Sequence, residues 1–152
     1  MENNYVITCC STADMPKEYL DKRNIPYVCF HFVIDGKSYP DDLGETVKIS
    51  DFYKMIADGA MPTTSQVNTD EFMQFFEPYL KDGKDIIHLS LSTGISGVYN
   101  SARIAAEELS AKYPERNITV IDTLCASAGF GLIIDMAADR RDSGMGYDEL
   151  CK

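Results

Sequence analysis

The sequence predicts a three-layer α/β/α domain built on a mostly parallel sheet. Short apolar runs alternate with segments of helical periodicity along the chain, and strands separated by helices usually pair in parallel with helices on both faces. The chain has 152 residues, of which 45% are hydrophobic, and this is enough to bury one core. We therefore expect a single domain over residues 1–152.

The first elements are two strands joined by a short helix. The run "YVITCC" at 5–10 predicts a strand, and residues 11–24 predict a turn and a short helix. The run "YVCFHFVI" at 27–34 predicts one further strand. The pair Asp35-Gly36 then predicts a turn that ends this strand.

Two helices are predicted in the middle of the chain. Ser50 is expected to cap the first, and Gly59 to end it, before a polar loop at 61–68. Thr69 is expected to cap the second, and Pro78 to kink or shorten it. The apolar face of this second helix consists of Phe72, Phe75, Phe76, Tyr79 and Leu80.

The last third of the chain alternates strands and helices in the same way. Strands are predicted at 85–91 and 117–123, and helices at 96–113 and 126–141. Gly144 and Gly146 then separate the last of these helices from the first turn of another. Because the sequence stops inside that turn, we expect this chain to be a fragment, and the alternative is a frayed tail.

The composition excludes some classes of function. Asp and Glu number 24 against 14 Lys and Arg, so the net charge is -10, which argues against nucleic acid as the main partner. No leader and no apolar run near 18 residues is visible, so we expect no membrane span and a cytoplasmic location. The five cysteines lack metal or disulfide spacing and are expected to be free thiols, without a metal or cofactor.

Three polar turns follow predicted strands, at 9–12, 92–97 and 122–127. Because parallel strands end at the same edge of a sheet, these turns are expected to meet there, with the loop at 61–68 folded over them. Hydroxyls and free N–H groups at helix starts bind anions. The alternative, which the residues alone leave open, is that each hydroxyl only caps its own helix.

Common nucleotide-binding and hydrolase motifs are absent from the sequence. His31 and His88 both lie inside predicted strands, where a histidine is usually a packing residue. An alternative function is nevertheless a phosphotransfer enzyme domain that uses one of these histidines as the phosphate carrier or base.

Five segments in this order resemble the DegV family of bacterial fatty-acid-binding proteins: "STADMP", "VIDGKSYPDD", "PTTSQ", "STGISGVYNSA" and "VIDTLCASAGFG". The resemblance implies that this chain is an N-terminal domain that binds the lipid headgroup, and that a second domain is absent. It implies non-catalytic binding of a long-chain fatty acid, whose carboxylate is held by loop hydroxyls. It also implies delivery of the bound acid to a partner, a fatty acid kinase.

The resemblance also assigns site residues, none of them catalytic. The ligand-binding residues that it implies are Thr64, Ser65, Ser92, Thr93, Gly94, Ser96 and Ser11. Two positions depart from the family pattern: Cys10 replaces an aspartate, and Val67 replaces a proline. We expect the first to change the acidic edge of the site and the second to change the rigidity of its loop.

Overall fold

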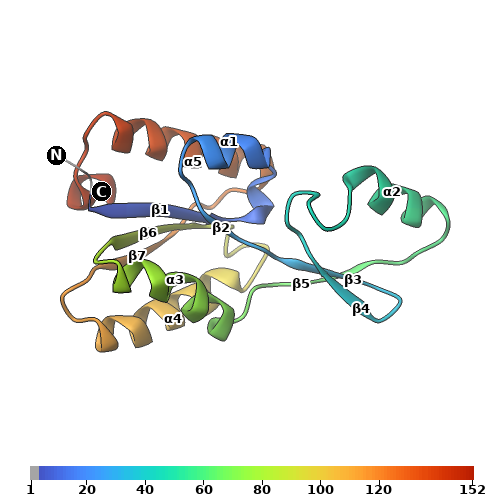
Figure 1. The fold of residues 1–152 in the computed structure, drawn as a ribbon, viewed down its shortest axis with the longest axis horizontal. Coiled ribbons are helices and arrows are strands. Elements are labelled where there is room, and N and C mark those ends of the chain that lie inside the picture. The colour runs from blue at the N-terminus through green and yellow to red at the C-terminus, as the bar shows by residue number, and fades with distance from the viewer. Residues whose placement is uncertain (1–3) are drawn as a thin grey trace.

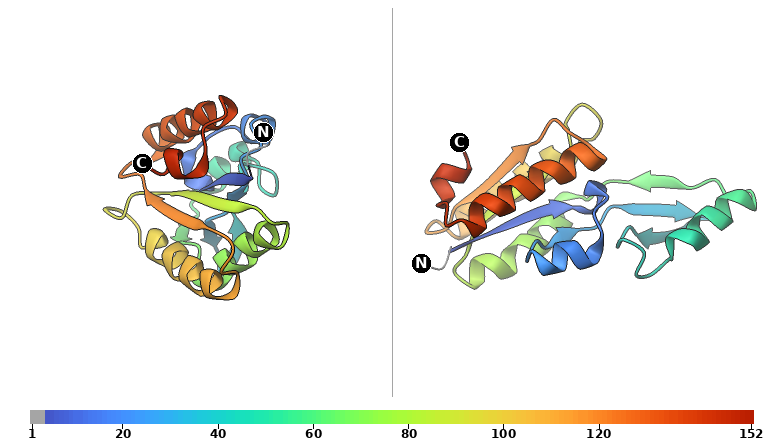
Figure 2. Two further views of the ribbon diagram at one scale, coloured as in Figure 1. Left: turned by 90° about the vertical axis from the view of Figure 1, so that its left-hand side faces the viewer. Right: turned by 90° about the horizontal axis from the view of Figure 1, so that it is seen from above.

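The computed structural model describes residues 4–152 and confirms a three-layer α/β/α arrangement (Figure 1). A four-stranded parallel sheet in the order β2-β1-β6-β7 forms its centre. The strands are β1 (Tyr5–Cys10), β2 (Tyr27–Val28), β6 (Asp85–Ser90) and β7 (Ile118–Asp122). The helices α1 (Lys17–Lys22) and α5 (Ser127–Asp142) cover one face, and α3 (Thr69–Lys81) and α4 (Val98–Lys112) cover the other (Figure 2).

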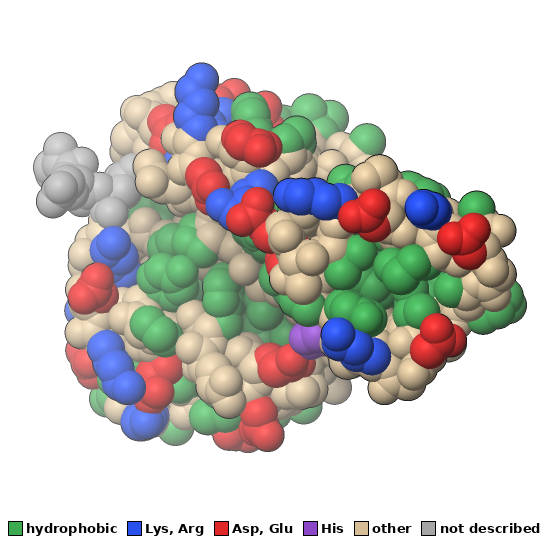
Figure 3. Space-filling view, turned by 45° about the vertical axis from the view of Figure 1, so that its right-hand side comes forward, with side chains coloured by type: hydrophobic (Ala, Val, Ile, Leu, Met, Phe, Trp, Pro, Cys, Tyr) green, Lys and Arg blue, Asp and Glu red, His purple; other side chains and the backbone are tan. Residues whose placement is uncertain are grey.

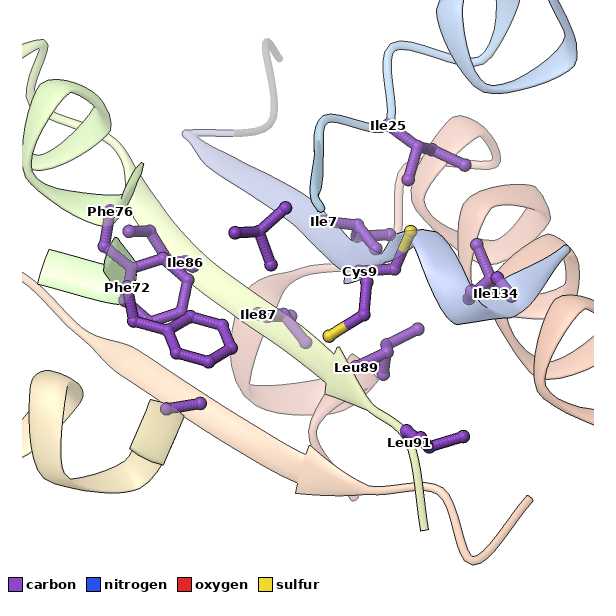
Figure 4. Close-up of a cluster of buried hydrophobic side chains, with 14 of the residues drawn as sticks. Ile7, Cys9, Ile25, Phe72, Phe76, Ile86, Ile87, Leu89, Leu91 and Ile134 are labelled. Atoms are coloured by element: carbon purple, nitrogen blue, oxygen red, sulfur yellow. The ribbon is translucent and has the colours of Figure 1, made fainter. Parts of the chain in front are cut away.

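The core lies on both faces of the two central strands, β1 and β6 (Figure 4). Five of the six residues of each strand are buried, which is typical of parallel strands covered on both faces. Phe72 and Phe76 of α3 pack on one face, and Ile134 of α5 packs on the other. The apolar pattern of α3 thus predicted the residues that face the core correctly.

The prediction of one strand at 27–34 was wrong, because two strands in different sheets share this run. After β2, the chain leaves the parallel sheet at Cys29 and Phe30 and enters β3 (His31–Ile34). This strand is the centre of a three-stranded antiparallel sheet, β4-β3-β5. The other two strands are β4 (Lys37–Pro40) and β5 (Thr63–Ser65). Asp35 and Gly36, with φ of 51° and 77°, form the predicted turn between β3 and β4.

The antiparallel sheet and helix α2 (Ile49–Ala57) form a lobe, residues 31–65, that projects from the parallel-sheet body (Figures 1 and 2). The loop predicted at 61–68 contains β5, because polar threonines pair through their backbone as readily as apolar residues do. Lys48, rather than Ser50, precedes α2. Gly59, with φ of 102°, ends it as expected.

Smaller differences concern the helix ends. Asn68, not Thr69, caps α3, and it forms a reciprocal capping box with Glu71. Pro78 does not end α3, because its ring lies on the exposed face while Phe76 and Leu80 hold the helix to the core. Two short helices were predicted only as turns or helix starts: η1 (Ser11–Ala13) and α6 (Tyr147–Leu150). Within the described residues, no helix combines the length and apolar character needed to cross a membrane.

Candidate functional site

A cavity of about 1260 Å³ lies where the lobe meets the body. The lobe contributes β3, α2, β5 and the segment after β4, and the body contributes the segments that follow β1 and β6. In Figure 3, where the lobe comes forward, apolar side chains gather on its surface with charged side chains around them. The cavity therefore combines an apolar wall with polar edges, as small-molecule sites generally do.

The apolar wall comes mainly from the lobe. Phe32 of β3 contacts Phe52 of α2 edge to face, with ring centroids 5.0 Å apart, and it stacks on Tyr39 at 5.3 Å. Helix α2 is amphipathic, yet none of its residues is buried. Its apolar side chains Ile49, Phe52 and Tyr53 line the cavity instead. The apolar face of this helix therefore contributes to the site and not to the core.

Three of the hydroxyl residues predicted from the sequence line the cavity together: Thr64, Ser65 and Ser96. Thr64 and Ser65 are exposed on β5, and no side-chain hydrogen bond engages either within the described structure. Ser96 Oγ donates to Gln66 Oε1 at 3.2 Å and accepts from the Val98 backbone N–H at 3.2 Å. The two hydroxyls on β5 are therefore available to a ligand, whereas the hydroxyl of Ser96 already has partners.

The other predicted residues of the 92–97 turn do not line the cavity. Ser92 Oγ accepts from the Gly94 backbone N–H at 3.1 Å, which stabilises the turn itself. Thr93 Oγ1 donates to Asp122 Oδ2 at 2.6 Å, and so it joins this turn to the end of β7. The backbone N–H of Ser92 also donates to the carbonyl of Cys125 at 3.1 Å. The turns at 92–97 and 122–127 meet as predicted, but the second contributes nothing to the cavity wall.

Ser11 lies behind the wall rather than in it. Its hydroxyl is buried, donates to Asp41 Oδ2 at 2.9 Å and accepts from the Phe30 backbone N–H at 3.1 Å. Asp41 itself lines the cavity, and burial raises the pKa of its carboxyl. Ser11 therefore acts on the cavity through Asp41, a residue that the sequence analysis did not select.

Gln66 is a second residue that the sequence analysis missed. Its side-chain amide accepts from Ser96 and donates from Nε2 to Ser101 Oγ at 3.3 Å, so it joins the end of β5 to the start of α4. A Cβ at Gly97 would lie 3.1 Å from Gln66 Oε1, which explains a glycine at this position. The sequence contained a signal for this residue, because Gln66 belongs to the segment "PTTSQ", from which Thr64 and Ser65 were selected as site residues.

The two histidines occupy different environments. His88 is fully buried, with Nδ1 2.9 Å from Thr8 Oγ1 and Phe72 and Phe76 packed edge to face on its ring. Burial lowers the pKa of His88 to about 3. A phosphoryl donor cannot reach this ring, which argues against His88 as a phosphate carrier. His31 lines the cavity, with Nε2 3.3 Å from Glu71 Oε1.

The thiols next to the site are buried. Cys9 and Cys10 lie on the end of β1, and burial raises the pKa of Cys9 to about 12 and also raises that of Cys10. A nucleophilic thiolate is therefore disfavoured at both positions. Residues 4–152 hold no group of three or more potential metal-ligating side chains.

A family model described as "uncharacterised protein, DegV family" matches residues 5–152. The chain belongs to the DegV family. A DegV domain-containing protein from Clostridium perfringens is 39% identical over 146 residues, which are 96% of this chain and 50% of that protein. The chain thus spans about half the length of the curated DegV relatives that it matches.

Two solved structures that share the fold are described as fatty-acid-binding proteins. A stearic acid-binding protein from Eubacterium ventriosum matches with a TM-score of 0.88 and 28% identity, over 96% of this chain and 50% of its own. A Thermotoga maritima protein with a fatty acid binding function matches with a TM-score of 0.84 and 32% identity, over 97% of this chain and 52% of its own.

Proposed function

We propose that this DegV chain binds a long-chain fatty acid in the cavity between lobe and body. The observation that carries the proposal is the cavity itself, which has an apolar wall from β3 and α2 and unengaged hydroxyls on β5. The fatty acids bound by the Eubacterium and Thermotoga relatives support the same ligand class. Binding of this kind requires no catalytic residue, and we propose a carrier rather than an enzyme.

The two parts of the ligand contribute differently to binding. At ~0.8 kcal/mol per buried methylene, a tail of about fifteen carbons gains on the order of 12 kcal/mol before the cost of ordering the chain. Each charge-assisted hydrogen bond to the carboxylate adds roughly 1.5–3 kcal/mol. The tail therefore supplies most of the affinity, and the hydroxyls select an acid over an ester or an alcohol.

We assign the direct carboxylate contact to Thr64, because its hydroxyl is exposed and unengaged and its partner in β3, Phe32, also lines the cavity. Ser65 is the next residue of β5, so its side chain points to the other face of the strand, and we propose that it borders the cavity at the end of β5. Ser96 completes this edge of the cavity and is oriented by Gln66. Ser92 and Gly94 shape the turn, and Ser11 acts through Asp41. Thr93 contacts the carboxylate directly only when its hydroxyl leaves Asp122.

We further propose that the loaded protein presents the fatty acid to a fatty acid kinase. The family resemblance supports this partner, and the exposure of Thr64 supports a bound carboxylate that another protein could reach. A reconstituted mixture of kinase, ATP and fatty acid should form acyl phosphate only when the DegV protein is present. Equal product without it would contradict this part of the proposal.

Native mass spectrometry of the chain purified from bacteria tests the binding function directly. We expect a population heavier by the mass of one fatty acid, since a ligand with its tail in an apolar cavity dissociates slowly. Titration with fatty acid provides the second measurement. Absence of both co-purified lipid and binding in titration would remove the proposed function.

The Thr64→Ala variant should weaken fatty acid binding about tenfold to a hundredfold, because it removes one charge-assisted hydrogen bond worth roughly 1.5–3 kcal/mol. The corresponding fatty alcohol should bind the variant almost as well as the wild type. Thr63→Ala is the matched control, since Thr63 is exposed on the same strand but does not line the cavity. An equal loss for alcohol and acid would exclude a carboxylate contact at Thr64.

A further inference from the structure

Thr12 carries a hydroxyl that has no partner. Thr12 is among the residues that line the cavity, but its Oγ1 atom is inaccessible to water and forms no hydrogen bond within residues 4–152. A buried unsatisfied hydroxyl is destabilising, so native structures rarely keep one without a reason. The neighbouring hydroxyl of Ser11, in contrast, both donates and accepts.

Rotation about χ1 of Thr12 can bring this hydroxyl to the cavity. Threonine side chains occupy staggered rotamers, and a change of rotamer moves Oγ1 to the position held before by either the methyl group or Hβ. The hydroxyl loses no hydrogen bond in this rotation, because it has none. In one of these two rotamers the apolar methyl group takes the buried position that Oγ1 leaves, so a ligand that offers an acceptor is expected to favour that rotamer.

Asp41, which lines the cavity with Thr12, supplies an acceptor. Ser11, the neighbour of Thr12 in the chain, donates to Oδ2 of Asp41, and the backbone N–H of Asp41 donates to the Phe30 carbonyl at 2.8 Å. These bonds fix the carboxyl of Asp41 at the cavity wall. A carboxylate has about four acceptor sites and Ser11 occupies one of them, so Asp41 can accept a further hydrogen bond from a ligand.

The corner of the cavity that contains Thr12 and Asp41 is separate from the hydroxyls on β5. Asp41 directly follows β4, and β4 and β5 flank β3 on opposite sides. With strands spaced about 4.8 Å apart, the two edges lie roughly 10 Å from each other. A ligand that places its carboxylate on Thr64 would therefore meet Asp41 along its acyl chain.

The charge of the corner excludes a second anionic group. Asp14, Glu18 and Asp42 line the cavity together with Asp41. The lysine of the lining, Lys17, is paired with Asp21 at 2.5 Å. A neutral group that both donates and accepts, such as a hydroxyl, fits a carboxylate beside an unpartnered hydroxyl.

We propose that Thr12 and Asp41 form a second polar subsite that takes a hydroxyl group on the acyl chain. The ligand class would then include hydroxylated long-chain fatty acids, with the ligand hydroxyl donating to Asp41 and accepting from Thr12. This inference rests on the proposed fatty acid function, and it adds a preference within that function.

The test compares stearic acid with a series of hydroxystearic acids whose hydroxyl is moved along the middle of the chain. Titration of the wild-type chain should show a preference for one range of hydroxyl positions over stearic acid. In Thr12→Val, which keeps the shape of the side chain, this preference should fall about threefold to tenfold, the value of one neutral hydrogen bond. Binding of stearic acid itself should not change.

Thermal unfolding without ligand separates a binding role from a structural one. Thr12→Val should be as stable as the wild type or more stable, because it removes an unsatisfied hydroxyl, and Thr12→Ser should retain the preference. Thr63→Val is the matched control and should change neither measurement. The subsite is excluded if no hydroxyl position is preferred or if Thr12→Val keeps the preference. A wild type that fails to bind stearic acid would instead remove the proposed function.

Discussion

Replacing Phe52 with aspartate is expected to lower fatty acid affinity by at least about thirtyfold. Phe52 lines the cavity from α2 and contacts the ring of Phe32, so its side chain should border the acyl tail. Covering an uncompensated polar group with an apolar chain costs roughly 2–7 kcal/mol, and more for a charge, and each 1.4 kcal/mol is about tenfold in affinity. Titration with stearic acid measures this loss.

Two further variants show whether the cavity causes the effect. Met61→Asp introduces the same charge into the same lobe, but Met61 is exposed and does not line the cavity, so its affinity should match that of the wild type. Phe52→Leu should retain most of the binding. Circular dichroism should show unchanged secondary structure in all three. If Phe52→Asp bound stearic acid as tightly as Met61→Asp, the acyl chain would not lie against α2.

The sequence predicted the body well because each of its elements buries an apolar face. The helix α3, for example, repeats apolar residues with the period of a helix, and Phe72 and Phe76 are buried as that period requires. In the lobe, α2 and the turn at Asp35-Gly36 were predicted, but the antiparallel sheet was not, because neither of its main signals is a buried pattern. The apolar run at 27–34 is continuous although two sheets share it, and β5 consists of polar, exposed residues.

The candidate site was predicted in part for a related reason. The type of a residue indicates that a hydroxyl exists, but not whether the folded chain engages it. Thr64 and Thr93 are similar in sequence terms, yet Thr64 is exposed in the cavity and Thr93 donates to Asp122 across two turns. Asp41 and Gln66 could not be assigned to the site from the sequence, because long-range hydrogen bonds to Ser11 and Ser96 connect them to it.

The apolar residues of α2 show another limit of the sequence pattern. Phe52, Met55 and Ile56 have the spacing of a face that packs on a core, and the sequence gives no means to separate a core from a ligand cavity. In the structure none of them is fully buried. An amphipathic helix without a buried residue is therefore a signal that only the structure provides, and here it marks the wall of the site.

Mild acid should destabilise this fold through His88. The folded chain keeps the ring neutral, because burial lowers the pKa of His88 to about 3 from an ordinary value of 6.5. The unfolded chain takes up a proton near pH 6.5, so between these two pH values the unfolded state binds more protons than the folded state. The contribution of His88 is therefore fully present above pH 6.5, and it is lost as the pH falls, by about 1.4 kcal/mol per pH unit.

The range from about pH 7.5 to about pH 5 isolates this effect, because exposed carboxylates remain ionised there. Urea unfolding across this range should show a loss of about 2 kcal/mol in the free energy of unfolding. Asp41 titrates in the opposite sense, since its raised pKa lets the folded state take up a proton first. Its contribution can reduce the observed loss but cannot produce it.

The His88→Gln variant provides the comparison. Glutamine can still hydrogen-bond to Thr8 but does not titrate, so the variant should be less stable at pH 7.5 and should lose little further stability by pH 5. NMR titration of the wild type supplies a measurement that does not depend on the variant folding. The His88 ring signals should stay constant down to about pH 4, because the ring has no access to water between Phe72 and Phe76. A midpoint near 6.5 would show that the ring exchanges with solvent, and the buried position of β6 at the centre of the sheet would then need revision.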